Sequence, residues 1–397
     1  MKVKKQLVSA IMLLVMAVFM SACADVDGGI PSISSEGSLG LDITLGSKDD
    51  YGDTSSENGK SQQEIVEKTF PEKCKIYKQK TKRFTEDQLL KLFDDNPQRT
   101  EESSDGYSYI EYSSDKYTGS IVDGTSLSFY SQTGSHYSVI CDSLYANTSE
   151  EKYISKDDSL SFESREKTLE VLQSQFKNLF GINPNEWWTK DFFAVKKEGV
   201  DFYKEKITEE AAADLENSDE SNDEKLQYTF QQLDNIPSED YYLLNIKFQI
   251  DGIPLYMGDG FNYGPGNAYS VLGSFARVVY SKNGIEQLDL YFLAETDTSP
   301  DGFQEVTLID TDKAQELIQN KFSSVILDAQ VEVYGMQLIY LPIPQNNLNS
   351  RFENYEAKPY YAFYWKESRS YEDKTYTTNY ITYFDAVTGS EFGTERC

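Results

Sequence analysis

The sequence has few histidines, few cysteines and too few basic residues to balance its acidic ones. A single histidine, His136, occurs among 397 residues, which excludes zinc sites built from several imidazoles and leaves one candidate for imidazole catalysis. The 37 lysine and arginine residues stand against 66 aspartate and glutamate residues, and the formal net charge is −29. A surface this acidic repels phosphate. We therefore expect no nucleic-acid partner.

Aromatic residues, in contrast, are abundant. The chain contains 29 tyrosines and 22 phenylalanines, and aromatic residues make up 14% of the sequence. This is enough material for a hydrophobic core, so a chain that is disordered throughout is excluded. The length of the chain predicts two or three domains.

The N-terminus has the pattern of a secretory signal. Lysines at positions 2, 4 and 5 precede the apolar run from Leu7 to Met20. This run is shorter than the about 20 residues that a membrane span needs, and it suits the core of a signal peptide. The run ends in Met20-Ser21-Ala22-Cys23, which resembles the lipobox of bacterial lipoproteins. An ordinary cleaved signal peptide followed by an incidental cysteine is the alternative.

The lipobox resemblance implies that residues 1–22 are removed and that Cys23 becomes the lipidated first residue. Long acyl chains on this residue would hold the protein at the extracytoplasmic face of the cell membrane, because each buried methylene contributes about 0.8 kcal/mol. Residues 23–64 are rich in Ser, Gly and Asp and contain almost no aromatics. We expect this segment to be a flexible, disordered tether.

Three cysteines follow Cys23, and their odd number leaves at least one free thiol. The first expectation is a disulfide between Cys74 and Cys141. Pairing that involves Cys397, or three free thiols, remain as alternatives. No Cys-x-x-Cys motif and no metal-ligand spacing occurs in the sequence, and we expect neither a metal nor another cofactor.

The remaining sequence predicts an α+β protein with two modules, each an antiparallel sheet packed with helices. The N-terminal module is expected over residues 65–205, an acidic linker over 206–235 and the C-terminal module over 236–397. The linker prediction rests on the run Asn217 to Glu224, which is dense in charge and lacks apolar residues.

The N-terminal module combines β-meander signals with two helices. A capping box at Thr85–Gln88 starts a short helix, and Ser164 starts a longer helix that ends at Gly181. The apolar positions of the longer helix recur at helical spacing. Short apolar stretches at Phe192–Val195 and Val200–Tyr203 predict one further hairpin.

The turn signals and helix caps of the C-terminal module are clearer. Asp251-Gly252 and Asn283-Gly284 are turn signals between apolar runs, and Asp310 or Thr311 caps a helix that ends near Phe322. The last strand runs into the sequence Tyr383-Phe384-Asp385-Ala386-Val387-Thr388-Gly389. Strands are also expected at Val331–Pro342, Tyr360–Trp365 and Tyr380–Phe384.

This order of motifs resembles the PepSY-like modules of Gram-positive extracytoplasmic proteins, and more closely the YycI/YycH-type regulators of a cell-wall sensor kinase. The resemblance covers residues 236–393. It implies a non-catalytic α+β module that works through contacts with other proteins. The regulators are anchored by a transmembrane helix, whereas this chain has a lipobox and a tether. No site residue is carried over from the family.

No catalytic residues emerge from the sequence. His136 and Cys141 are five residues apart in a strand-like stretch, so they would face opposite sides of that strand. No Gly-x-Ser-x-Gly elbow occurs. The Gly-rich stretch around Tyr263 lacks the Gly-Lys-Ser/Thr ending of a phosphate loop.

Five aromatic residues are candidates for a binding surface, because aromatic side chains provide contact area at low entropic cost. Placement in the core or on a sheet face is the alternative for all of them. The five candidates are Trp187, Trp188, Tyr263, Tyr361 and Trp365.

Taken together, these features predict a lipid-anchored binding or regulatory protein with an envelope protein as partner. A lipoprotein that captures a peptide, a glycan or a cation is the second hypothesis, and a carboxylate-based hydrolase is the third. The 66 carboxylates leave the third hypothesis open, although no spacing identifies a catalytic pair.

Overall fold

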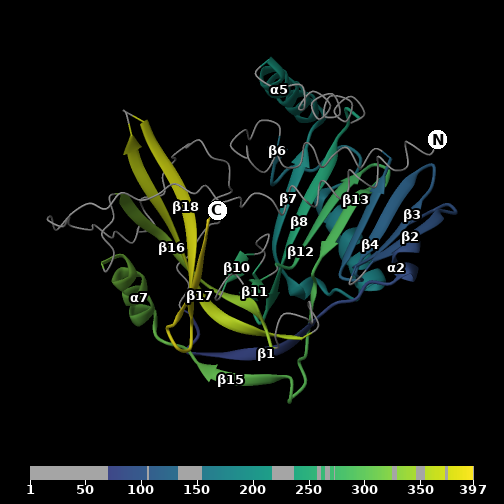
Figure 1. Cartoon of the computed structure of the whole chain (residues 1–397). Helices are drawn as coiled ribbons and strands as arrows, with labels where there is room; N and C mark the ends of the chain where they lie inside the picture. Colours follow the sequence, from purple (N-terminus) through teal and green to yellow (C-terminus); the bar gives the residue numbers. More distant parts are fainter. Residues whose placement is uncertain are drawn as a thin grey trace. The chain divides into compact units, whose positions relative to one another are not determined.

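The structure is a computed structural model of the whole chain (Figure 1). It describes residues 70–104, 107–132, 154–216, 237–256, 261–263, 269–271, 273–323, 329–345, 354–371 and 374–396. The expected signal peptide, Cys23 and the tether lie outside these ranges, as do His136, Cys141 and Cys397. Predictions about them remain predictions, except for the disulfide between Cys74 and Cys141, because Cys74 is described.

Most of the described strands belong to two antiparallel sheets, the large sheet and the small sheet. Within the described ranges the large sheet has ten strands in the order β2-β3-β4-β5-β13-β12-β8-β7-β6, with β9 paired to β8 (Figure 1). Its strands are β2 (Gln98–Ser104), β3 (Tyr107–Ser113), β4 (Tyr117–Val122), β5 (Ser126–Ser131), β6 (Ile154–Ser155), β7 (Trp187–Val195), β8 (Tyr241–Ile250), β9 (Ile253–Pro254), β12 (Phe275–Ser281) and β13 (Gly284–Tyr291).

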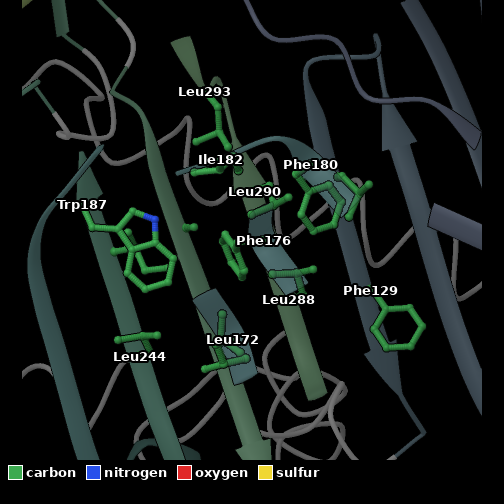
Figure 2. Packing of buried hydrophobic residues seen from close by; sticks show 14 of the residues in the cluster. Phe129, Leu172, Phe176, Phe180, Ile182, Trp187, Leu244, Leu288, Leu290 and Leu293 are labelled. Carbon is green, nitrogen blue, oxygen red and sulfur yellow. The ribbon is translucent and has the colours of Figure 1, made fainter. Parts of the chain in front are cut away.

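One face of the large sheet carries the main hydrophobic core, together with α2 (Glu86–Leu90), α4 (Arg165–Gln175) and the π-helical turn η1 (Phe176–Phe180). Leu172 and Phe176 are fully buried against the sheet. Figure 2 shows Phe176 beside Leu288 and Leu290 of β13. Alternation along each strand therefore directs every second residue into this core.

The helix predicted from Ser164 to Gly181 is confirmed, with a change at its end. The Ser164 hydroxyl accepts a hydrogen bond from the Lys167 backbone N–H at 3.2 Å, which is N-cap geometry. From Phe176 onward the helix widens into the π-helical turn. Gly181 ends it at φ 65°, where a residue without Cβ is favoured. The short turn η2 (Pro184–Glu186) follows.

The opposite face of the large sheet is covered at one end by α5 (Lys197–Glu216). This corrects two predictions. Val200–Tyr203 belongs to the helix and not to a hairpin strand, and the helix continues to Glu216, inside the expected linker 206–235. Val200 and Tyr203 are one helical turn apart, and both are buried against the sheet.

The small sheet has seven strands within the described ranges. Its main path is β14-β1-β17-β18-β19, while β15 pairs with β1 and β16 pairs with β17. The strands are β1 (Lys73–Thr81), β14 (Ala294–Thr296), β15 (Phe303–Thr307), β16 (Gln330–Pro344), β17 (Tyr355–Tyr371), β18 (Lys374–Asp385) and β19 (Glu391–Arg396). Helix α7 (Thr311–Ser323) packs on one face through Ala314, Ile318 and Phe322.

The other face of the small sheet is also apolar. It carries a cluster that includes Tyr256, Ile339, Leu341 and Tyr360. A two-stranded ribbon, β10 (Phe261–Tyr263) with β11 (Tyr269–Val271), contributes Val271 to this cluster. Both faces of the small sheet are therefore closed by hydrophobic contacts.

The two sheets confirm a fold of antiparallel sheets packed with helices, mostly β in content. They correct the predicted division at residues 206–235. Strands β8, β12 and β13 of the expected C-terminal module pair within the large sheet, and β1 of the expected N-terminal module pairs with β17. The acidic composition of the linker marks a loop, but it carries no information about which strand edges pair with each other.

Candidate functional site

Three of the five aromatic residues predicted to form a binding surface lie in the core. Trp187 is 3% exposed, Tyr361 is 1% exposed and Trp365 is 8% exposed. Trp187 packs against Phe176, with ring centroids 5.4 Å apart. Trp365 stacks on Tyr380 at 4.3 Å and is held by Nε1 donating to Thr382 Oγ1 at 3.0 Å. The core alternative is correct for these three.

For the two remaining aromatics, the binding surface stays a prediction. Trp188 is partly buried, and Tyr263 lies at the end of β10 in a segment whose side chains are not described. The structure separates Trp187 from Tyr361 and Trp365. Trp187 packs in the main core of the large sheet, whereas Tyr361 and Trp365 pack in the core of the small sheet.

Cys74 is a free, buried thiol, which corrects the expected disulfide with Cys141. Its Sγ lies 2.9 Å from the Tyr340 hydroxyl, and that hydroxyl donates to the backbone carbonyl of Lys75 at 2.8 Å. Burial raises the pKa of Cys74, so the thiol stays protonated at neutral pH. The residue acts as a core hydrophobe in β1.

The candidate site is the second face of the large sheet, beyond the part that α5 covers. The strand register places polar residues opposite one another in a continuous line from β2 to β7. We call this line the polar row. Its members are Thr100, Glu111, Ser120, Ser128, Asp289, Arg277, Asn245 and Asp191.

The centre of the polar row is a buried carboxylate with two side-chain donors. Asp289 is 3% exposed. Its Oδ1 accepts from the Tyr130 hydroxyl at 2.5 Å, and its Oδ2 accepts from Gln287 Nε2 at 2.6 Å. Burial, followed by the Asp289 charge, raises the pKa of Tyr130 well above its ordinary value. Tyr130 is therefore a neutral donor, which is the form that a buried carboxylate requires.

Gln287 leaves one polar atom without a partner. The side chain is 1% exposed, and its Oε1 forms no hydrogen bond. A buried carbonyl oxygen without a donor costs about 1–3 kcal/mol. This oxygen, next to the hydrogen-bonded Asp289, therefore lowers the stability of the folded state.

Charged residues continue along the row on β12, β8 and β7. Arg277 is opposite Asn245, and Asn245 is opposite Asp191. Lys247, two residues along β8 from Asn245 and on the same face, forms an ion pair with Asp191 at 3.7 Å. Burial lowers the pKa of Lys247, and the Asp191 carboxylate opposes this change.

Two apolar borders limit this charged area. At one end, Val279, Leu243 and Phe193 lie under α5. At the other end, Phe275 and Tyr291 pack with ring centroids 4.7 Å apart. A polar strip between aromatic and aliphatic borders suits the recognition of a ligand with both polar and apolar parts.

The chemistry of this face is hydrogen bonding and ion pairing. Within the described ranges, no group of three histidine, cysteine, aspartate or glutamate side chains is arranged to hold a metal ion. The charged residues come from separate strands, and the sequence analysis did not select them. One signal was available, because β13 reads Gln287-Leu288-Asp289-Leu290, with apolar and polar residues in alternation.

No family model matches the chain, and no curated protein matches its sequence. The fold is similar to the crystal structure of an uncharacterised protein from Eubacterium rectale, with a TM-score of 0.54 and 16% identity over 82% of this chain and 87% of that one. A second solved structure, the YpeB C-terminal domain of Bacillus megaterium, aligns with a TM-score of 0.28 and 10% identity over 79% of this chain and 98% of that one. The first likeness concerns the fold alone, and the second is too weak to support an argument.

Among the helices that the structure describes, none combines the length and the hydrophobicity needed to cross a bilayer.

Proposed function

We propose that the protein is anchored by a lipid at the extracytoplasmic face of the cell membrane and is a non-catalytic binding or regulatory module for envelope proteins. The observation that carries this proposal is the N-terminal pattern of three lysines, the apolar run Leu7–Met20 and the small residues before Cys23. The PepSY-like order of motifs in residues 236–393 is the reason for choosing a binding role over a catalytic one.

The polar row supports the binding part of the proposal. Charged groups on a sheet face are costly to desolvate, and folding alone is better served by apolar residues there. Asp289 and Lys247 nevertheless lie on this face and are almost completely buried. A role in recognition accounts for residues that stability does not require.

Metabolic labelling with a palmitate analogue tests the anchor. We expect the wild-type chain to carry the label and to fractionate with membranes, and we expect Cys23→Ser to lose the label and to be released. Cys74→Ser is the matched control, because this thiol is buried beside Tyr340 and should not affect labelling. Equal labelling of Cys23→Ser and the wild type would contradict the proposal.

A second candidate function is the capture of a small ligand by the second face of the large sheet. One observation favours it over a purely macromolecular role: the ion pair of Lys247 with Asp191, at 3.7 Å, lies on this face between apolar borders.

A further inference from the structure

Phe292 has a backbone conformation that is unusual for an aromatic residue. It lies in the short connection between β13, which ends at Tyr291 in the large sheet, and β14, which begins at Ala294 in the small sheet. Its φ of 46° is in the left-handed region, where the Cβ atom approaches the following carbonyl oxygen. The other two described non-glycine residues with positive φ are Asp123 and Asp251, and aspartate tolerates this region. For a bulky residue the same conformation is strained.

Hydrogen bonds hold the backbone of Phe292 on both sides. Its N–H donates to the carbonyl of Thr125 at 3.1 Å, and its carbonyl accepts from the Ser274 hydroxyl at 2.7 Å. Thr125 and Ser274 are both buried. The next residue, Leu293, is buried in the main core, and its carbonyl accepts from the Lys82 N–H at 2.7 Å. The surrounding structure therefore determines the conformation of Phe292 several times over, which is the condition under which a strained residue persists.

These bonds belong to a series of hydrogen bonds that joins the two sheets. In the small sheet, the carbonyl of Tyr340 in β16 accepts from the Tyr256 N–H at 2.8 Å. The Tyr256 carbonyl accepts from the N–H of Ser274, which directly precedes β12 of the large sheet, at 3.2 Å. Ser274 in turn donates its hydroxyl hydrogen to Phe292. One serine thus connects the strained residue with both sheets.

We propose that Phe292 is a strained hinge residue and that the junction around it opens as one unit. In the open junction the φ of Phe292 returns to negative values, and the hydrogen bonds with Thr125, Ser274 and Tyr256 break together. Relaxation of the strained backbone offsets part of the cost of the broken bonds, so opening requires less free energy than it would around an unstrained residue.

Such a junction is a conformational switch for the regulatory role. A partner that binds the closed junction more tightly than the open one, or the reverse, shifts the equilibrium between them. The open state affects both sheets because Ser274 contacts Phe292 on one side and Tyr256 on the other. This inference goes beyond the proposed function and does not depend on the lipid anchor, so the result of palmitate labelling at Cys23 has no bearing on it.

Two substitutions at position 292 test the strain. Phe292→Gly and Phe292→Ala both remove the ring and its contacts, and they differ chiefly in the cost of a positive φ. We expect the folding equilibrium constant of Phe292→Gly to exceed that of Phe292→Ala by about threefold or more, measured by urea denaturation. Ala294→Gly is the matched control in the neighbouring strand β14, and it should lower the constant by about twofold or more.

Amide hydrogen exchange of the full chain tests the concerted opening. The N–H groups of Phe292, Ser274 and Tyr256 all donate hydrogen bonds at the junction. We expect these three amides to exchange with similar opening constants, at least about tenfold larger than that of Leu288 in the middle of β13. In Phe292→Gly, the amides of residues 274 and 256 should exchange about threefold or more slowly than in the wild type, because the closed junction is no longer strained.

Ser274→Ala separates a concerted opening from a local one. The substitution removes the hydroxyl that donates to Phe292, so we expect the amides of Phe292 and Tyr256 to exchange about threefold or more faster, while Leu288 is unchanged. Ser281→Ala is the control, because this buried serine lies at the other end of β12, donates to Glu286 and should leave the junction amides unchanged.

Three results would overturn the inference. The first is a Phe292→Ala variant at least as stable as Phe292→Gly, which would show that residue 292 is not strained. The second is a wild-type chain in which the junction amides exchange as slowly as Leu288. The third is a Ser274→Ala variant in which exchange at Phe292 accelerates and exchange at Tyr256 does not. The exchange measurements on the wild type and Ser274→Ala decide the matter even if a variant of residue 292 does not fold.

Discussion

The second face of each sheet is covered in a different way in the two sheets. On the small sheet this face is closed by apolar residues such as Ile339, Leu341 and Tyr360. On the large sheet, α5 closes one end, while the polar row occupies the rest. The small sheet shows that this chain can seal both faces of a sheet with hydrophobic contacts. The polar row is therefore a departure that folding does not demand, and this makes it the best candidate for recognition.

Tyrosine hydroxyls satisfy the carboxylates on both of these faces. Tyr130 donates to Asp289 on the large sheet, and Tyr256 donates to Glu395 at 2.7 Å on the small sheet. In a chain with far more acids than bases, tyrosine supplies donors without requiring a positive charge. The difference lies in exposure, because Asp289 is buried and Glu395 is only partly buried.

We expect the largest loss of stability from a substitution on the apolar face of the large sheet. The effects of substitutions on the second faces are compared with it. Phe176→Ala removes a fully buried ring from the centre of the main core (Figure 2). We expect the free energy of unfolding to fall by about 3–5 kcal/mol. Urea denaturation measures it, and a loss below about 1 kcal/mol would show that this core contributes little to stability.

Tyr130→Phe tests the polar row directly. The substitution keeps the ring but leaves the buried Asp289 carboxylate with one side-chain donor fewer, so we expect a loss of about 1–3 kcal/mol. The same denaturation measurement applies. No loss of stability would mean that water, and not Tyr130, satisfies Asp289.

Tyr256→Phe is the counterpart on the small sheet, and its effect should be smaller. Glu395 also accepts a hydrogen bond from Tyr383 and is partly exposed, so the lost donor is replaced by water more easily. We expect a loss of about 0.5–1.5 kcal/mol. A loss larger than that of Tyr130→Phe would reverse the contrast between the two faces.

The smallest effect concerns acid sensitivity at the apolar face of the large sheet. Hydrogen bonds from Arg99 and then from Tyr112 lower the pKa of Glu86 below its ordinary value of 4.5. The folded state therefore favours the carboxylate, and this stabilisation is complete above the ordinary pKa and is lost as the pH falls through the lowered pKa. Glu86 is partly exposed, so we expect at most about 1 kcal/mol.

In Glu86→Gln, the free energy of unfolding should fall less steeply than in the wild type as the pH is lowered, by this small amount. Urea denaturation at pH values from neutral to below 4.5 measures the difference. Glu305→Gln is the counterpart on the small sheet, because a hydrogen bond from Lys73 also lowers the pKa of Glu305, and it should change the pH dependence in the same direction. If Glu86→Gln loses the same free energy of unfolding at acidic pH as the wild type, the proposed contribution of Glu86 is excluded.

Local signals in the sequence predicted local structure well. The capping residue Ser164 and the terminator Gly181 bound the helix that the structure contains. The hairpin expected around Asn283-Gly284 joins β12 to β13, and Gly284, the first residue of β13, has φ 105°. These features depend on residues within a few positions of one another, and their chemistry is readable without the rest of the fold.

Short apolar stretches were less reliable. The apolar residues of Val200–Tyr203 fit the spacing of a helix as well as that of a strand. In the structure the segment is helical, and Val200 and Tyr203 are buried together with Leu243. The same limit explains the aromatic candidates. Tyrosine and tryptophan occur in cores and on surfaces, so the sequence left both placements open for Tyr361 and Trp365, and both side chains are buried.

The candidate site could not be predicted from the sequence, for a different reason. Its row joins Ser128 of β5 to Asp289 of β13, a pairing between segments far apart in the chain. Alternation in β8 and β13 indicates which residues share a face, but only the strand order brings Lys247 next to Arg277. Non-local strand pairing leaves no fixed spacing in the sequence.

The central claim is that the second face of the large sheet meets a partner in the envelope. Site-specific photo-crosslinking in intact cells tests it most directly, with the photoreactive residue at Thr100, the exposed end of the polar row, and at the exposed Lys313 of α7 as control. We expect a discrete crosslinked species from position 100 that is absent from position 313 and is lost in the Cys23→Ser background. Identical products from both positions, or none from position 100, would contradict it.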